Sequence, residues 1–194
     1  SVVGDGPYNN FLNIDPRVSL LYRIDSSSQL KLSYGDYHQY LQLISNSLSP
    51  FSSLEVWLPA NTNIRPQFAR QWSLNYARQF RKGFDFSTAL YYKQYFNQID
   101  YRDHASLLLN QFLEGELRFG TMKSYGIEFL LQKPQGRLNG RMSYSYSRTI
   151  RRTPALNGGR TYPAFQDRPH EFTALLNYQL SKRWLFSAYW TLFS

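Results

Sequence analysis

Apolar and polar residues alternate strictly over residues 137–149. Every second position is apolar or aromatic apart from one glycine: Leu138, Gly140, Met142, Tyr144 and Tyr146. The intervening positions are polar: Arg137, Asn139, Arg141, Ser143, Ser145 and Ser147. Because successive strand residues point to opposite sides of a sheet, this stretch predicts a strand with one apolar and one polar face. A tilted strand of about 9–11 such residues is long enough to cross a bilayer.

The same alternation recurs along the chain and predicts eight strands in four hairpins. They are expected at about residues 15–24, 29–40, 69–80, 84–98, 125–131, 137–149, 171–178 and 184–192. Short polar turns join the members of each pair, at residues 25–28, 81–83, 133–136 and 181–183. Longer connections at about residues 42–66, 102–121 and 151–168 separate the pairs. Short periplasmic turns and long extracellular loops are typical of outer-membrane barrels, so we expect the four turns at the periplasmic rim and the long connections on the extracellular side.

The composition is compatible with strands that cross a membrane. The mean hydropathy is -0.50 and aromatic residues make up 18% of the chain. No stretch approaches the ~18 consecutive apolar residues of a membrane helix, but barrel strands need only every second residue to be apolar. A soluble antiparallel sandwich alternates in the same way and is the alternative, although its strands are usually about 5–6 residues long. We therefore predict an all-β, antiparallel up-and-down transmembrane β-barrel segment.

The sequence lacks the residues and motifs that several kinds of catalysis and binding require. The chain has no cysteine, so disulfides and thiol catalysis are excluded. It contains no glycine-rich phosphate loop, nucleophile elbow or paired-histidine motif. The formal net charge of +9 invites a nucleic-acid partner, but the basic residues are scattered. We predict no enzyme activity, no cofactor, no metal site and no nucleic-acid partner.

The long connections hold the candidate ligand-binding residues, since binding residues commonly sit on loops carried by a rigid scaffold. For ring stacking and anion contacts we select Trp57, Tyr101, Arg118, Arg160 and Tyr162. Two of them have simpler interpretations: Arg118 pairs with Glu116, and Tyr162 anchors the start of the seventh strand. Four residues in mid-strand on the apolar face are expected to face lipid: Leu90, Ile127, Tyr144 and Leu176.

Short motifs follow one another in a regular order along the chain. They are residues 114–120 (EGELRFG), 124–129 (SYGIEF) and 140–148 (GRMSYSYSR), then Tyr162-Pro163-Ala164, Asp167-Arg168 and His170, and earlier residues 91–93, 99–101, 16–17 and 33–34. In this order they resemble TonB-dependent outer-membrane receptors, and the resemblance covers essentially the whole chain. It is closest to the large-receptor branch that carries an N-terminal carboxypeptidase-regulatory-like domain.

The resemblance implies a barrel of about 22 strands with a plugged lumen in the outer membrane of a Gram-negative bacterium. It implies import of a scarce nutrient, such as an iron chelate, cobalamin, glycan or peptide, with energy relayed by TonB. The implied partners are outer-membrane lipid, the TonB complex through the plug, that small-molecule, glycan or peptide ligand, and a surface lipoprotein.

This sequence shows no plug, no TonB box and fewer strands than the family pattern. We therefore expect residues 1–194 to be an internal segment of the C-terminal half of a single barrel domain. The alternative is a complete eight-stranded outer-membrane barrel that acts as an adhesin or structural protein, because eight strands can close with a filled interior.

Overall fold

The computed structural model describes residues 11–45, 55–101, 115, 117–154, 156–165 and 167–194. The strands are β1 (Arg17–Arg23), β2 (Ser28–Gln39), β3 (Leu41–Ser45), β4 (Glu55–Pro59), β5 (Gln67–Phe80), β6 (Phe84–Tyr101), β7 (Leu117–Lys133), β8 (Leu138–Arg152), β9 (Tyr162–Pro163), β10 (His170–Ser181) and β11 (Trp184–Phe193). The 3-10 turn η2 (Asn157–Gly159) is the helical element within these ranges. No helix there is long and apolar enough to cross a membrane.

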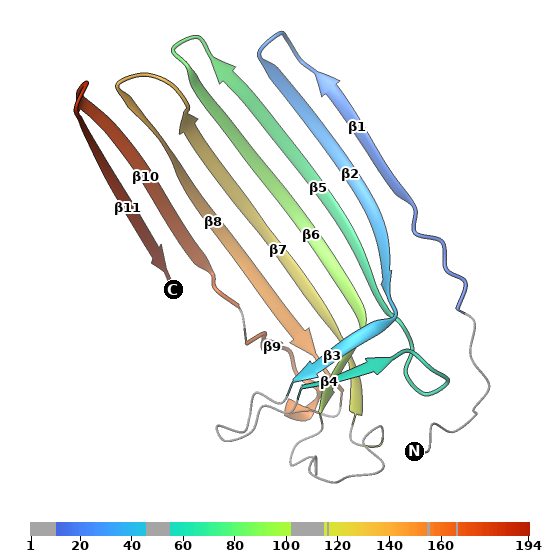
Figure 1. Ribbon diagram of the computed structural model, residues 1–194. Helices are drawn as coiled ribbons and strands as arrows, with labels where there is room; N and C mark the ends of the chain where they lie inside the picture. Colours follow the sequence, from blue (N-terminus) through green and yellow to red (C-terminus); the bar gives the residue numbers. More distant parts are fainter. Residues whose placement is uncertain (1–10, 46–54, 102–114, 116, 155, 166) are drawn as a thin grey trace.

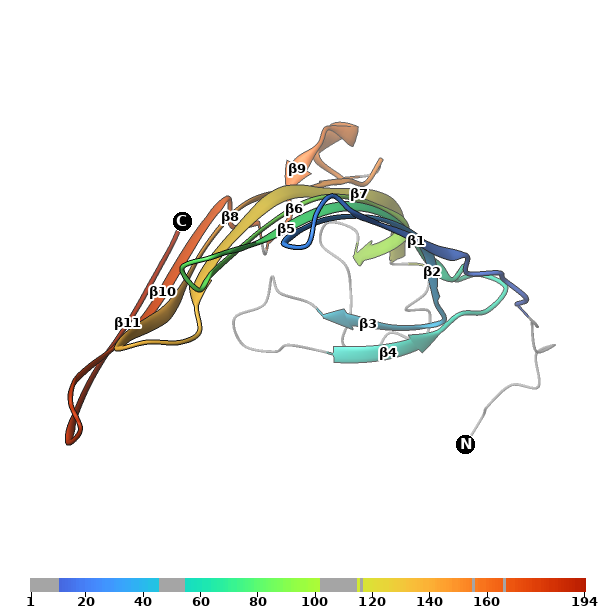
Figure 2. The same ribbon diagram turned by 90° about the horizontal axis from the view of Figure 1, so that it is seen from above.

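The long strands form one antiparallel sheet in the order β1-β2-β5-β6-β7-β8-β10-β11 (Figure 1). Each long strand pairs with the next long strand along the chain, which is the predicted up-and-down arrangement. The sheet is curved and open, with β1 and β11 at its two edges (Figure 2). All eight predicted strands are confirmed. The sequence did not predict the separate β3–β4 hairpin or the two-residue strand β9, which pairs with β8.

The two ends of the sheet differ in how the strands are connected. The four short turns all lie at one end, here called the turn end, which confirms that they share a rim (Figure 1). Gly83 and Gly136 provide the left-handed backbone that two of these turns need, with φ of 74° and 108°. In the first turn, Asp25 Oδ1 accepts hydrogen bonds from the Ser27 backbone and hydroxyl, both at 2.7 Å. The β3–β4 hairpin and β9 lie at the opposite end, here called the loop end (Figure 1).

Strand register separates an apolar face from a polar one, because residues paired across an antiparallel sheet share a face. One row of directly paired residues on the apolar face is Leu32, Leu74, Leu90, Ile127 and Tyr146. One row on the polar face is Ser33, Ser73, Tyr91, Gly126 and Ser147. Tyr144 and Leu176 occupy alternate positions on the same face as Ile127, so the four residues expected to face lipid do share one face.

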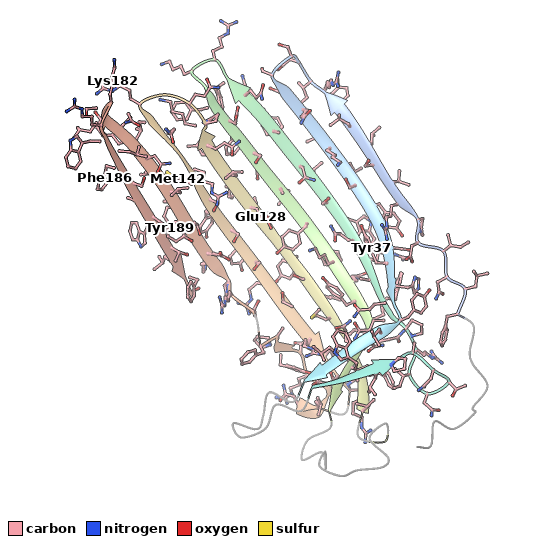
Figure 3. The ribbon with its side chains drawn as sticks, in the orientation of Figure 1. Tyr37, Glu128, Met142, Lys182, Phe186 and Tyr189 are labelled. Atoms are coloured by element: carbon pink, nitrogen blue, oxygen red, sulfur yellow. The ribbon has the colours of Figure 1, made fainter. Side chains whose placement is uncertain are left out.

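The sheet is a single layer, and its side chains project from both faces without a second layer over most of its length (Figure 3). Leu90 is 48% exposed although it lies in mid-strand. Among the described residues the buried hydrophobic ones are few: Ile64, Ile99, Leu117, Ala164 and Ala174. A large exposed apolar face marks an interaction with other protein or with membrane.

The apolar face has the height of a bilayer's hydrocarbon layer. On β6 it extends from Phe84, at the turn end, to Tyr92 in an aromatic row. These positions are about 27 Å apart along the strand at ~3.4 Å per residue, close to the roughly 25 Å apolar band of a membrane barrel once the strand is tilted. The aromatic row is Tyr34, Trp72, Tyr92 and Tyr125. Beyond it β6 continues to Tyr101, about 30 Å further.

Candidate functional site

The five candidate ligand-binding residues all fall on segments at the loop end (Figure 1). Trp57 lies on β4, Tyr101 ends β6, and Arg118 lies near the start of β7. Arg160 follows η2, and Tyr162 begins β9. The structure thus places them on the part of the molecule that extends past the apolar band.

A bulge redirects β6 where it leaves the apolar band. The register between β6 and β7 shifts between Tyr95 and Gln98, and Asn97 has a positive φ of 55°. Asparagine tolerates this left-handed conformation better than most residues. Its side-chain amide donates a 2.9 Å hydrogen bond to the Pro66 carbonyl, which ties the bulge to the segment before β5. After the bulge, Asp100 is paired opposite Arg118 on β7.

Asp100 is the centre of a hydrogen-bonded network between β6, β8 and β9. Arg151 Nη1 lies 3.3 Å from Asp100 Oδ2, and the Tyr162 hydroxyl donates to the same oxygen at 3.2 Å. With its proton committed to Asp100, the Tyr162 hydroxyl accepts from the Thr153 hydroxyl at 3.1 Å. Burial raises the pKa of Tyr162, so its hydroxyl stays protonated and able to donate.

Glycine at position 120 makes room for this network. Gly120 lies on β7, between the β6 and β8 segments that carry the network. A Cβ there would lie 2.6 Å from the Arg152 carbonyl oxygen and 2.6 Å from Thr153 Oγ1. The missing side chain therefore lets the end of β8 approach β7 closely, and Thr153 is almost completely buried there.

A second carboxylate fastens the segment that leads from β9 to β10. Asp167 Oδ1 accepts a 2.6 Å hydrogen bond from the Thr149 backbone, and Asp167 Oδ2 lies 3.2 Å from Arg148 Nε. The Asp167 side chain is only 5% exposed. The Ser147 backbone also donates to the Pro169 carbonyl at 3.0 Å. This connection therefore runs back along the edge of β8.

Arg118 and Tyr162 are both engaged by the protein itself. The Arg118 guanidinium donates to the carbonyls of Gly115 and Leu117, at 3.0 and 2.8 Å. The expected partner Glu116 lies outside the described residues. Tyr162 is held by Asp100 and Thr153, so it anchors β9 rather than the start of β10 directly.

Trp57 and Arg160 are both exposed among the described residues. Trp57 is 59% exposed and faces its cross-strand partner Leu43, also exposed, on the β3–β4 hairpin. The Arg160 side chain is exposed and has no hydrogen bond or ion pair within the described part of the chain. The side chain of Tyr101 is outside that part, so only its backbone pairing with Leu117 can be stated.

The β3–β4 hairpin is anchored on the polar face. Gln42 is 1% exposed, donates to the Arg65 carbonyl at 3.2 Å and accepts from Gln67 Nε2 at 2.9 Å. Gln67 lies on the polar face of β5, because it is an even number of residues from Ser73. The hairpin accordingly lies on the concave side of the sheet (Figure 2), whereas β9 continues the sheet beside β8. Trp57 and Tyr162 are therefore separate features of the loop end.

Sequence reasoning missed the residues that organise this end. Asp100 and Asp167 entered the sequence analysis only as motif positions, and Arg151 and Gln42 were not singled out. The long polar connections indicated that charged side chains lie at this end. They did not show which carboxylate pairs with which cation. Within the described residues, no group of His, Asp or Glu side chains is arranged to hold a metal ion.

Shallow hollows lie along the polar face of the described sheet. One of about 450 Å³ lies at the turn end and is lined by residues of the first turn, β5, β6 and β7. Another of about 410 Å³ lies in mid-sheet, with Glu128, Ser145 and Glu171 in its lining. The serine, asparagine and carboxylate side chains among these linings suit a water-filled lumen. With the apolar outer face, they define the class of protein: a wall of a transmembrane β-barrel.

Comparison with known families identifies which barrel this is. The family described as TonB dependent receptor-like, beta-barrel matches residues 2–193. The chain therefore belongs to the TonB-dependent receptor β-barrel family, which confirms the resemblance and the fold class. Members are outer-membrane transport receptors, a family that is generally not enzymatic. The comparison with curated proteins gave no significant match.

Proposed function

We propose that the protein forms part of the wall of an outer-membrane receptor that imports a scarce nutrient with energy relayed by TonB. The observation that carries this proposal is one continuous sheet with an apolar face of bilayer height and a polar opposite face. The candidate substrates are those of the family resemblance: an iron chelate, cobalamin, a glycan or a peptide. The TonB complex would be contacted through a plug domain, and a surface lipoprotein would assist capture.

The open sheet favours a large receptor over a closed eight-stranded barrel. β1 pairs only with β2, and β11 pairs only with β10, within the described residues. The polar face is also rich in serine, as in the row through Ser33, Ser73 and Ser147. Small polar side chains suit a wide aqueous lumen, whereas an eight-stranded barrel fills its interior with side chains. A small barrel acting as an adhesin or structural protein is therefore the weaker candidate.

The membrane orientation is tested by placing the same charge on the two faces. Ile127→Arg introduces a cation on the apolar face, one row inside the aromatic row, and should cost about 2 kcal/mol of folding free energy in a bilayer, since the cost falls from roughly 2–4 kcal/mol at the midplane to about 0–1 kcal/mol at the interfaces. Ser145→Arg is the matched control, because Ser145 lies on the polar face between Glu128 and Glu171 in adjacent strands. Folding of the full-length protein into lipid vesicles, followed by denaturant titration, measures both. Equal losses would contradict the assigned faces.

The ligand-binding role of the loop end is tested by uptake. Alanine at Trp57, Tyr101, Arg118, Arg160 and Tyr162 in the full-length receptor should weaken uptake of the cognate compound, with surface expression confirmed. Labelled ferric chelates, cobalamin, oligosaccharides and peptides form the panel. Trp57 and Arg160 should account for most of the loss, since Arg118 and Tyr162 are already engaged by the protein. Unchanged uptake would place recognition elsewhere in the receptor.

A further inference from the structure

Three cations lie close together on the apolar side of β7 and β8: Lys123, Arg148 and Arg152, here called the outer cationic triad. Lys123 is paired opposite Ile150, and the two arginines are two residues to either side of Ile150 on the same strand. Alternate strand positions share a face, so both arginines are diagonal neighbours of Lys123, about 7–8 Å away. The register, not the sequence spacing, creates this group.

The triad begins where the apolar band ends. Arg148 is paired opposite Tyr125, the β7 member of the aromatic row, and Lys123 is the next β7 residue on that face. Aromatic girdles of membrane barrels lie at the interface between hydrocarbon and headgroups. A side chain one row further out therefore lies at headgroup level, on the side that faces lipid.

The protein compensates only part of this charge. Asp167 pairs with Arg148. Arg152 Nε donates to the neutral carbonyl of Gly159 at 3.1 Å. The Lys123 side chain is exposed and has no ion pair or hydrogen bond among the residues that the structure describes. Since like charges at neighbouring strand positions repel, the uncompensated pair of charges favours an external anion.

Cations on the same face at the turn end are arranged differently. Arg78 lies over the Phe80 ring, 5.3 Å from its centre, and Lys133 lies over the Phe84 ring at 5.4 Å. These contacts give the two cations a partner within the protein. No triad member lies over a ring in the described part of the chain, so the triad is the group on this face that is open to a ligand.

We propose that the outer cationic triad binds the phosphate group of an anionic lipid in the outer leaflet. Arginine forks bind phosphate oxygens in a bidentate manner, and lysine contributes a point charge. The proposal rests on the proposed function, because it requires the apolar face to lie in an outer membrane. The triad would give the lipid-facing surface of β7 and β8 a specific lipid-binding site in addition to its nonspecific contact with the bilayer.

The test counts lipids bound to the full-length receptor. The protein is reconstituted in phosphatidylcholine vesicles containing a bis-phosphorylated glucosamine-disaccharide lipid, extracted, and analysed by native mass spectrometry. Each cation near an anionic lipid surface is worth about 1 kcal/mol, so Lys123→Ala with Arg152→Ala should weaken retention about 30-fold. Arg81→Ala with Lys82→Ala removes the same charge from the turn at the other end and should leave retention unchanged.

Three outcomes would overturn the proposal. Equal retention by the triad variant and the turn variant removes the triad as the site. Equal retention of the dephosphorylated glycolipid shows that the phosphate is not recognised. Displacement of the lipid by millimolar inorganic phosphate identifies a free-anion site instead. Failure of wild-type protein to insert into the vesicles would defeat the proposed membrane function as well, whereas normal insertion with equal retention defeats only the lipid site.

Discussion

The two ends of the sheet are held by different kinds of contact. At the turn end, each hairpin closes on itself through a short turn, as in the Asp25–Ser27 hydrogen bonds. At the loop end, carboxylates join segments that are distant in sequence: Asp36 with Arg70, Asp100 with Arg151 and Asp167 with Arg148. The described residues contain no ion pair at the turn end.

The difference follows from chain connectivity. A turn of a few residues brings two strands together at little entropic cost, so no further contact is required. A connection such as that between β8 and β10 has many alternative paths, and only tertiary contacts select one. Asp36 shows the strength of such contacts, since it receives two hydrogen bonds of 2.9 Å from Arg70 and its side chain is 9% exposed. The loop end therefore combines long connections with defined positions for the side chains that these contacts hold.

The largest effect is expected for Asp167→Ala. It removes the acceptor of the Thr149 backbone and the counter-charge of Arg148, and should cost about 3 kcal/mol. Asp85→Ala is the matched control at the turn end, because the Asp85 side chain has no hydrogen bond or ion pair among the described residues. It should change stability by less than about 0.5 kcal/mol. Denaturant midpoints of the full-length protein in micelles measure both changes. Equal shifts would contradict the conclusion that carboxylate contacts stabilise the loop end and not the turn end.

Gly120→Ala is expected to have the next largest effect. The added Cβ would meet the Arg152 carbonyl and Thr153, so β7 and β8 must separate at the loop end. Overpacking of this kind costs about 2 kcal/mol. Gly115→Ala, where a Cβ meets nothing within 4 Å, is the control. Amide hydrogen exchange should accelerate around Thr153 and not in the four turns; acceleration in the turns would mean that the two ends are coupled.

Tyr162→Phe removes one donor from the Asp100 network while keeping the ring. The expected cost is about 1 kcal/mol. Trypsin cleavage after the exposed Arg160 should then become about fivefold faster, because cleavage follows the population of the open connection. Tyr178→Phe at the turn end has no hydroxyl hydrogen bond to lose within the described chain and serves as control. An unchanged cleavage rate in Tyr162→Phe would show that Arg151 alone secures the network.

The smallest effect concerns the first turn. The hydrogen bond from the Ser27 hydroxyl holds the pKa of Asp25 below its usual value. A carboxyl whose folded pKa is lowered contributes stability above its unfolded pKa of about 3.9, and loses it as the pH falls through the folded pKa. Asp25→Asn should therefore reduce the loss of thermal stability between pH 5 and pH 2–3 by a small amount. If Asp25→Asn changed the loss of thermal stability at low pH more than removal of a loop-end carboxylate did, the turn end would depend more on its carboxylate than the loop end does.

Local patterning was enough to predict the sheet but not the loop end. The strand around Met142 and Tyr144 was predicted because alternation is visible within ten residues. Strand β9 was missed because it has two residues, one of them Pro163, which cannot donate to a ladder. The β3–β4 hairpin was missed because two five-residue strands are weak signals inside a long connection. Trp57 was rightly placed at this end, but its separation from Tyr162 was not foreseen.

The sequence by itself determined which residues form the long strands, where the short turns lie and which strand positions share a face. These properties depend on neighbours within a few residues, through the two-residue period of a strand and the backbone preferences of turn residues. Only the tertiary structure decided that Lys123 lies opposite Ile150, that Arg151 on β8 pairs with Asp100 on β6, and that Gln42 anchors a hairpin on the polar face. These contacts join residues 20 or more positions apart, and long-range register is set by the fit of whole strands rather than by local chemistry.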